Sequence, residues 1–162
     1  MNKFHFSLPS TQASRLEAIE ARFGVQLPGD YKEFILKYNG GSPDYPIFNC
    51  HFNKSNKVEE CCLLFILGIT DDHLPSSATF INQGFHENDE EMRGFWVFGV
   101  CDRGHLIFNC RDNNIAVCDL NATYGVPQGG FSNIILKPFS GLIDSLAADR
   151  KRKWVPQNWS ED

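Results

Sequence analysis

The sequence lacks any long hydrophobic run. Its longest, CLLFILGI at residues 61–68, is far shorter than the roughly 20 apolar residues that a helix needs to cross a membrane. The N-terminal residues MNKFHFSLPS also lack the basic segment and following apolar stretch of a secretion signal. We therefore expect a cytoplasmic protein with no membrane partner.

The motifs of common catalytic sites are absent as well. The sequence has no phosphate-binding loop of the GxxxxGK[ST] type, no HExxH and no GxSxG. Asp71, Asp72 and His73 would place carboxylates beside a base, but such a cluster before Leu-Pro is typical of a solvated turn. We predict no enzymatic activity and no cofactor. Catalytic groups also come together from distant positions in a sequence. The prediction of no enzymatic activity therefore depends only on the absence of known catalytic motifs.

Basic residues are scarce outside one short segment. The chain has 15 Lys and Arg against 20 Asp and Glu, a formal net charge of −5. Four of the basic residues form RKRK at 150–153, so residues 1–149 carry 11 basic and 18 acidic residues, a net charge of −7. Such a body lacks the basic face that phosphate binding needs, so we expect no nucleic-acid partner. It favours a basic protein partner, although acidity also serves solubility.

The cysteines lack the spacing of a common zinc site, and no export signal supports a disulfide framework. Free cysteine inside a protein behaves as a small hydrophobic residue, which is the interpretation we favour. A cross-strand metal site and a catalytic thiol are the alternatives. We predict that none of the six forms a disulfide or binds metal: Cys50, Cys61, Cys62, Cys101, Cys110 and Cys118.

Residues 16–41, LEAIEARFGVQLPGDYKEFILKYNGG, predict two short amphipathic helices. In the first, apolar residues recur at three- and four-residue spacing from Leu16 to Phe23, and Gly24 suits a left-handed cap. Pro28 suits the first turn of the second helix, where its missing N–H is no loss, and Asp30 places a negative charge near the favourable end of the helix dipole. The residues of its apolar face are Tyr31, Phe34, Ile35 and Tyr38. Asn-Gly-Gly then ends this helix with residues that tolerate positive φ.

Strands dominate the centre of the chain. Between residues 95 and 119, three β-prone runs are separated by short turns, so the strands should be antiparallel neighbours. The run at 61–69 is apolar throughout, as expected of a buried strand. We predict strands at 61–69, 95–102, 105–110 and 115–119, shorter strands at 47–52 and 134–136, and a final helix with Ser140 as its N-cap. For residues 76–94 we expect a helical turn followed by an exposed acidic loop or frayed helix.

The residue pattern of the two N-terminal helices resembles the signature of the SUKH superfamily, mostly bacterial immunity proteins that neutralise toxins, with related fungal regulators of cell-wall synthesis. The residues that carry it are Leu16, Ile19, Gly24, Leu27, Pro28, Asp30, Tyr31, Phe34, Ile35, Asn39, Gly40 and Gly41. Residues 95–119 look like the family's central hairpin, and residues 137–146 are similar to its closing helix.

The order of elements predicts a single α+β domain, with an antiparallel sheet against which two N-terminal helices and a C-terminal helix pack. The resemblance implies the same architecture. We expect the domain to span residues 1–153, followed by a C-terminal tail at 154–162.

The resemblance also implies a function without catalysis. It indicates a protein-binding module, an immunity protein that neutralises a cognate, basic toxin by binding it. The alternative is an intracellular regulatory or scaffold domain of the cell-wall-regulator type. A weaker alternative is a small-molecule or metal-binding protein that uses the cysteine-bearing strands.

One acidic segment is our main candidate for the partner-binding surface, because opposite charge attracts a basic partner. A solvated loop kept charged for solubility is the alternative interpretation. Tyrosine and tryptophan supply many binding hot spots, and Tyr124 lies in a loop rich in glycine and proline. The candidate residues are Glu87, Asp89, Glu90 and Glu91, with Asp71 and Asp72 as companions and Tyr124 as the aromatic contact.

Overall fold

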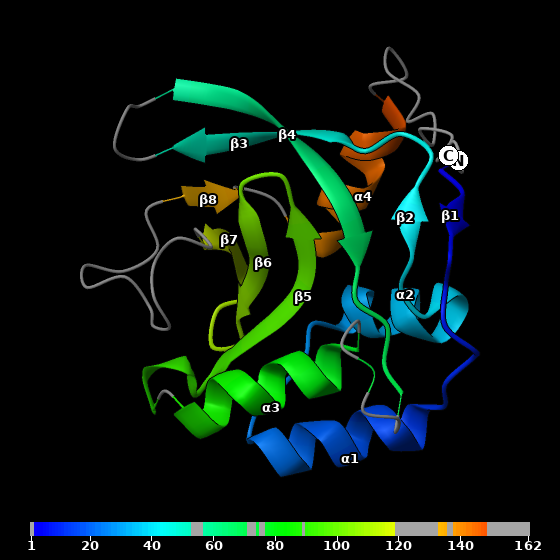
Figure 1. Ribbon diagram of the computed structural model, residues 1–162, viewed down its shortest axis with the longest axis vertical. Coiled ribbons are helices and arrows are strands. Elements are labelled where there is room, and N and C mark those ends of the chain that lie inside the picture. The colour runs from blue at the N-terminus through cyan, green and yellow to red at the C-terminus, as the bar shows by residue number, and fades with distance from the viewer. Residues whose placement is uncertain are drawn as a thin grey trace, which may run out of the picture.

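Six antiparallel strands form a sheet that closes on itself in the order β3-β4-β5-β6-β7-β8 (Figure 1). The short β8 pairs with both β7 and β3, which closes the sheet. The strands are β3 (Ile47–Phe52), β4 (Lys57–Ile66), β5 (Phe95–Cys101), β6 (Gly104–Asn109), β7 (Asn114–Cys118) and β8 (Asn133–Ile135). This computed structural model describes residues 2–52, 57–70, 74, 77–88, 90–118, 133–135 and 138–148.

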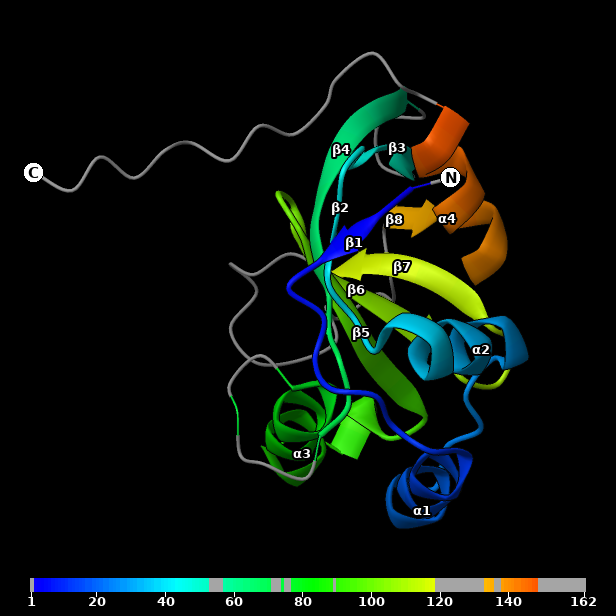
Figure 2. The same cartoon turned by 90° about the vertical axis from the view of Figure 1, so that its right-hand side faces the viewer.

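Helices cover this sheet at one end and on one side. Figure 1 shows α1 and α3 side by side below the strands, and Figure 2 shows α2 and α4 on the same side of the sheet. The helices are α1 (Ala13–Phe23), α2 (Gly29–Tyr38), α3 (Ala78–Asn88), the 3₁₀ turn η1 (Glu90–Met92) and α4 (Phe139–Ala148). A separate pair, β1 (Phe4–His5) and β2 (Ser42–Pro43), ties the N-terminus to the body. The predicted α+β architecture is confirmed.

Both N-terminal helices end as their sequence predicts. Gly24 has φ +64° and Asn39 has φ +48°, so each adopts the left-handed conformation of a helix C-cap. Asp30 does more than favour the α2 dipole. Its carboxylate accepts a hydrogen bond from the backbone N–H of Tyr31 at 2.9 Å and one from Ser140 at 2.8 Å. One side chain therefore accepts hydrogen bonds from backbone N–H groups in the first turns of both α2 and α4.

Aromatic side chains fill the space between the sheet and the helices. Phe98 and Phe108 stack at 4.1 Å between ring centroids, and Phe139 meets both edge-on. Tyr31 is fully buried, and its hydroxyl accepts a hydrogen bond from Nε1 of Trp96 at 3.3 Å. Burial raises the pKa of Tyr31 well above its usual range, so this phenol stays neutral. Trp96 is likewise fully buried and belongs to the core.

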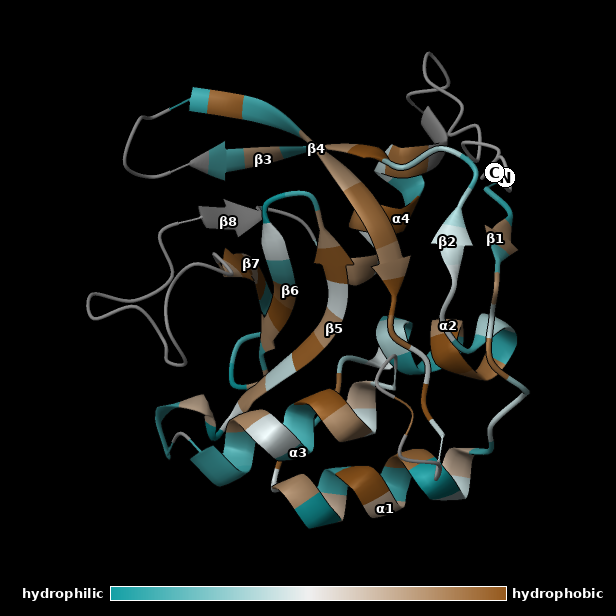
Figure 3. Cartoon of the chain, in the orientation of Figure 1, coloured by the Kyte–Doolittle hydropathy of each residue, from teal (hydrophilic) through white to brown (hydrophobic). Residues whose placement is uncertain are grey.

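The boundaries of several predicted elements differ from the structure. The strand expected at 61–69 is β4, which begins at Lys57, because its first half forms a polar hairpin with β3. Figure 3 shows this change from a mostly hydrophilic start of β4 to a hydrophobic end. The helical turn expected near Ser76 is the full helix α3, which includes the start of the acidic segment. Ser140 is not the N-cap, since α4 already begins at Phe139.

Candidate interaction surfaces

The acidic segment lies at the junction of α3 and η1. Glu87 is in the last turn of α3, and Glu90 and Glu91 open η1. All three are exposed. Oε1 of Glu87 accepts a hydrogen bond from Nε2 of Gln83 at 2.8 Å. This bond holds the Glu87 carboxylate against a side chain of the preceding helical turn. The structure thus brings three of the candidate residues together on one surface.

Two arginines border this segment: Arg93 follows it directly in the sequence, whereas the approach of Arg22 depends on the packing of α1 beside α3. A cleft of about 260 Å³ separates α1 from α3, and Arg22 and Arg93 both line it. Nη2 of Arg22 donates to Oε1 of Gln83 at 3.0 Å, and its guanidinium lies 5.0 Å from the ring centroid of Phe23. Arg93 reaches Glu90 at 3.8 Å, where both side chains are mostly exposed. The surface is therefore acidic at η1 and mixed in charge toward α1.

Four of the other predicted contacts, Asp71, Asp72, Asp89 and Tyr124, lie outside the described residues. Glu59 and Glu60, a further acidic pair in the sequence, are on the first half of β4. That part of β4 and the α3–η1 junction lie at opposite ends of the molecule in Figure 1, so the two acidic groups do not form one surface. Glu59 instead forms an ion pair with Arg103 at 3.0 Å.

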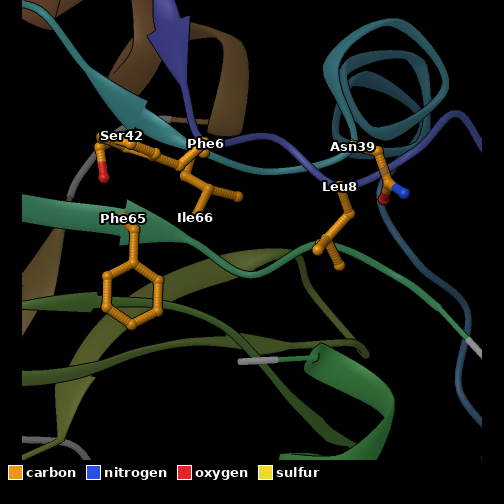
Figure 4. A pocket seen from close by; sticks show the side chains of 8 residues that line it. Phe6, Leu8, Asn39, Ser42, Phe65 and Ile66 are labelled. Atoms are coloured by element: carbon orange, nitrogen blue, oxygen red, sulfur yellow. The ribbon is translucent and has the colours of Figure 1, made fainter. Parts of the chain in front are cut away.

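A small, mostly apolar groove of about 240 Å³ opens beside β4 (Figure 4). The segment that follows β1 forms one wall through Phe6 and Leu8, and β4 forms the other through Phe65 and Ile66. Phe6 is 81% exposed and has φ +59°, a conformation that is rare for an aromatic residue. No motif in the sequence marks this groove, because its two walls are nearly 60 residues apart along the chain.

Glycines allow the end of α2 to approach the end of β4 and the segment that follows it. A Cβ atom on Gly40 would lie 2.6 Å from the backbone nitrogen of Gly68, which is closer than van der Waals contact permits. Asn39 holds the same junction through Nδ2, which donates to the carbonyls of Pro9 and Ile69. Its Oδ1 also accepts from the N–H of Ile69 at 2.7 Å. The Asn-Gly-Gly motif therefore ends α2 and joins it to β4.

His105 and the six cysteines are all buried or half-buried. His105 packs edge-on against Phe85 with ring centroids 5.6 Å apart, and burial lowers its pKa. Cys50, Cys61 and Cys101 belong to the core, whereas Cys62, Cys110 and Cys118 are half-buried. Across the described ranges, no group of three His, Cys, Asp or Glu side chains is placed to hold a metal ion. No helix among them has the length and apolar character needed to span a bilayer.

Comparison with known proteins gives one family. Residues 13–119 match the family model SUKH_6, described as SMI1-KNR4 cell-wall. The match runs from α1 to the end of β7, so it includes α1, α2 and α3 and five strands of the closed sheet. The resemblance stated from residues 16–41 and 95–119 is confirmed, while residues 137–146 lie beyond the matched range. A comparison with curated proteins gives no match.

Proposed function

The chain belongs to the SUKH_6 family, SMI1-KNR4 cell-wall, and from this membership we propose that it is a protein-binding module without catalytic activity. Within that class, we propose an immunity protein that neutralises a cognate bacterial toxin by binding it. The single observation that carries the proposal is the family match over residues 13–119. SUKH-family proteins are in general not catalysts.

The exposed acidic segment supports a binding role. Glu87, Glu90 and Glu91 present carboxylates on one surface of a chain whose net charge is −5. A toxin that cleaves or binds nucleic acid needs a basic face to hold phosphates, and an acidic surface is complementary to such a face. The mechanism would be steric and electrostatic masking of the toxin, with no turnover. We therefore propose a basic toxin as the partner, bound in the cytoplasm.

The neighbouring genes provide the test. The chain should be co-expressed with the product of an adjacent toxin-like gene, and growth should be compared with that of cells carrying the toxin alone. Restored growth, together with a stable complex of the two purified proteins, is the expected result. Growth arrest that persists despite soluble expression of the chain would contradict the immunity role. An unrelated toxin is the control, because a cognate inhibitor should not protect against it.

The description of the matched family, SMI1-KNR4 cell-wall, favours a second candidate. It refers to the cell wall, and a regulatory or scaffold domain of that type would also act by binding proteins. The two candidates differ in genetic context and in deletion phenotype. If deletion of the gene changes sensitivity to wall-damaging compounds in a strain without any toxin, the regulatory role is supported and the immunity role is not.

A further inference from the structure

The cleft between α1 and α3 holds charges of both signs in fixed places (Figure 1). Arg22 is exposed in the last turn of α1, and its Nη2 donates to Oε1 of Gln83 on α3 at 3.0 Å. The same Gln83 side chain donates from Nε2 to Oε1 of Glu87 at 2.8 Å. One amide therefore holds a guanidinium at one end and a carboxylate at the other.

The guanidinium of Arg22 also lies over a well-supported aromatic ring. It is 5.0 Å from the ring centroid of Phe23, which is half-buried. Trp96 and His86 each meet the Phe23 ring edge-on, with centroids 5.3 Å away. An arginine that is stacked on a ring and bonded on one side loses less conformational freedom on binding than an unsupported side chain. Arg22 is therefore pre-organised to bind an anionic group.

Arg22 has no acidic partner among the described residues, although the chain has more acidic than basic residues. A guanidinium has five N–H donors, so the bond to Gln83 leaves others for a ligand. Arg93 lines the same cleft of about 260 Å³. It reaches Glu90 at 3.8 Å, a loose ion pair in which both side chains are mostly exposed. Two guanidinium groups therefore border one cleft with donors to offer.

We propose that this cleft receives an aspartate or glutamate side chain of the protein partner, which Arg22 binds while Glu87 and Glu90 meet basic residues beside it. The inference rests on the proposed function and specifies the partner's surface as basic, with an acidic side chain among its basic residues. Complementary charges in register favour one docking orientation. A partner face with basic residues alone would be repelled at Arg22 and Arg93, so the cleft also discriminates among basic toxins.

Arg22 and the acidic segment should affect different rate constants. Exposed rim charges mainly speed the encounter, whereas a charge enclosed by the partner mainly slows dissociation. With the product of the adjacent toxin-like gene as partner, Arg22→Ala should raise Kd about tenfold or more, mostly through faster dissociation. Lys37→Ala is the matched control, because Lys37 is an exposed basic residue in the last turn of α2 that stacks on Tyr38. It should leave both rates unchanged.

Cross-linking identifies the group that enters the cleft. Arg22→Lys keeps the positive charge and supplies an amine, which a carbodiimide joins to a carboxylate in direct contact. Mass spectrometry of the treated complex should show position 22 linked to an aspartate or glutamate of the partner. If the complex is intact and position 22 is linked to its own chain alone, or to nothing, the inference is overturned.

The same experiments distinguish the two ways of failing. If the wild type neither binds the toxin nor protects against it, the immunity role is contradicted and the carboxylate site falls with it. If the wild type protects but Arg22→Ala dissociates at the wild-type rate, the immunity role stands and the carboxylate site is overturned. Circular dichroism of each variant confirms that a faster dissociation does not come from unfolding.

Discussion

The side-chain amide of Asn39 forms two hydrogen bonds with the backbone of Ile69, one to its carbonyl oxygen and one from its N–H, as a neighbouring strand would. Its Nδ2 donates to the carbonyl oxygen of Ile69 at 3.0 Å, and its Oδ1 accepts from the backbone N–H of Ile69 at 2.7 Å. The residue is 1% exposed and lies at the end of α2, so the amide connects that helix to the segment after β4. Buried backbone groups need such partners, because water cannot replace them.

The first prediction concerns this junction. Asn39→Ala should lower the free energy of unfolding by about 2–4 kcal/mol, because it leaves buried backbone groups without partners and puts alanine at a positive φ. Urea denaturation measures the change. Asn113→Ala is the matched control, since Asn113 also has positive φ, at +60°, but is exposed in a turn. It should cost about 1 kcal/mol. Equal losses in the two variants would contradict the proposed role of the buried amide.

Two glycines should respond in opposite directions to the same substitution. Gly40→Ala should destabilise the protein strongly, because its Cβ would collide with the backbone of Gly68 and its φ is +89°. Gly84 lies in the interior of α3, and a Cβ there meets nothing within 4 Å. Gly84→Ala should therefore raise stability by about 0.5–1 kcal/mol. Thermal unfolding followed by circular dichroism distinguishes them, and a Tm that falls in both variants would contradict the open space at Gly84.

The sequence predicted features with local causes better than those that depend on distant contacts. The caps at Gly24 and Asn39 follow from residue types that accept positive φ, and both were predicted. The closure of the sheet through β8 was not predicted, because it depends on pairing with both β3 and β7. The candidate surface shows the same division. The acidic run was visible in the sequence, whereas Arg22 approaches it only because α1 packs beside α3.

His105 should make stability depend on pH. Burial lowers the pKa of His105 below the unperturbed value of 6.5, so His105 binds a proton more readily in the unfolded chain than in the folded one. Stability should therefore fall as the pH drops below 6.5, and the loss should be complete once the pH passes below the folded pKa. In His105→Gln, the change in unfolding free energy between pH 7 and pH 5 should be smaller than in the wild type. The neighbours of His105 include Val100 and Cys118 on the two flanking strands and Phe85 against its ring. An unchanged pH profile in this variant would assign the effect to other groups.

The acidic segment should affect binding rather than folding. Reversing Glu87, Asp89, Glu90 and Glu91 to lysine should leave stability nearly unchanged, because exposed charges contribute little to folding. The variant should associate more slowly with a basic partner, and the difference from the wild type should shrink as salt rises, since salt screens steering at long range. Surface plasmon resonance at low and high ionic strength measures this directly.

The matched control reverses two exposed acidic residues on α2 and α4, Glu33 and Asp144, which lie away from α3. Because Arg22 and Arg93 already border the segment, the quadruple variant replaces acidic side chains beside two arginines with basic ones. If its association rate matches that of the control at every salt concentration, the partner binds elsewhere, and the groove beside Phe6 becomes the next surface to test.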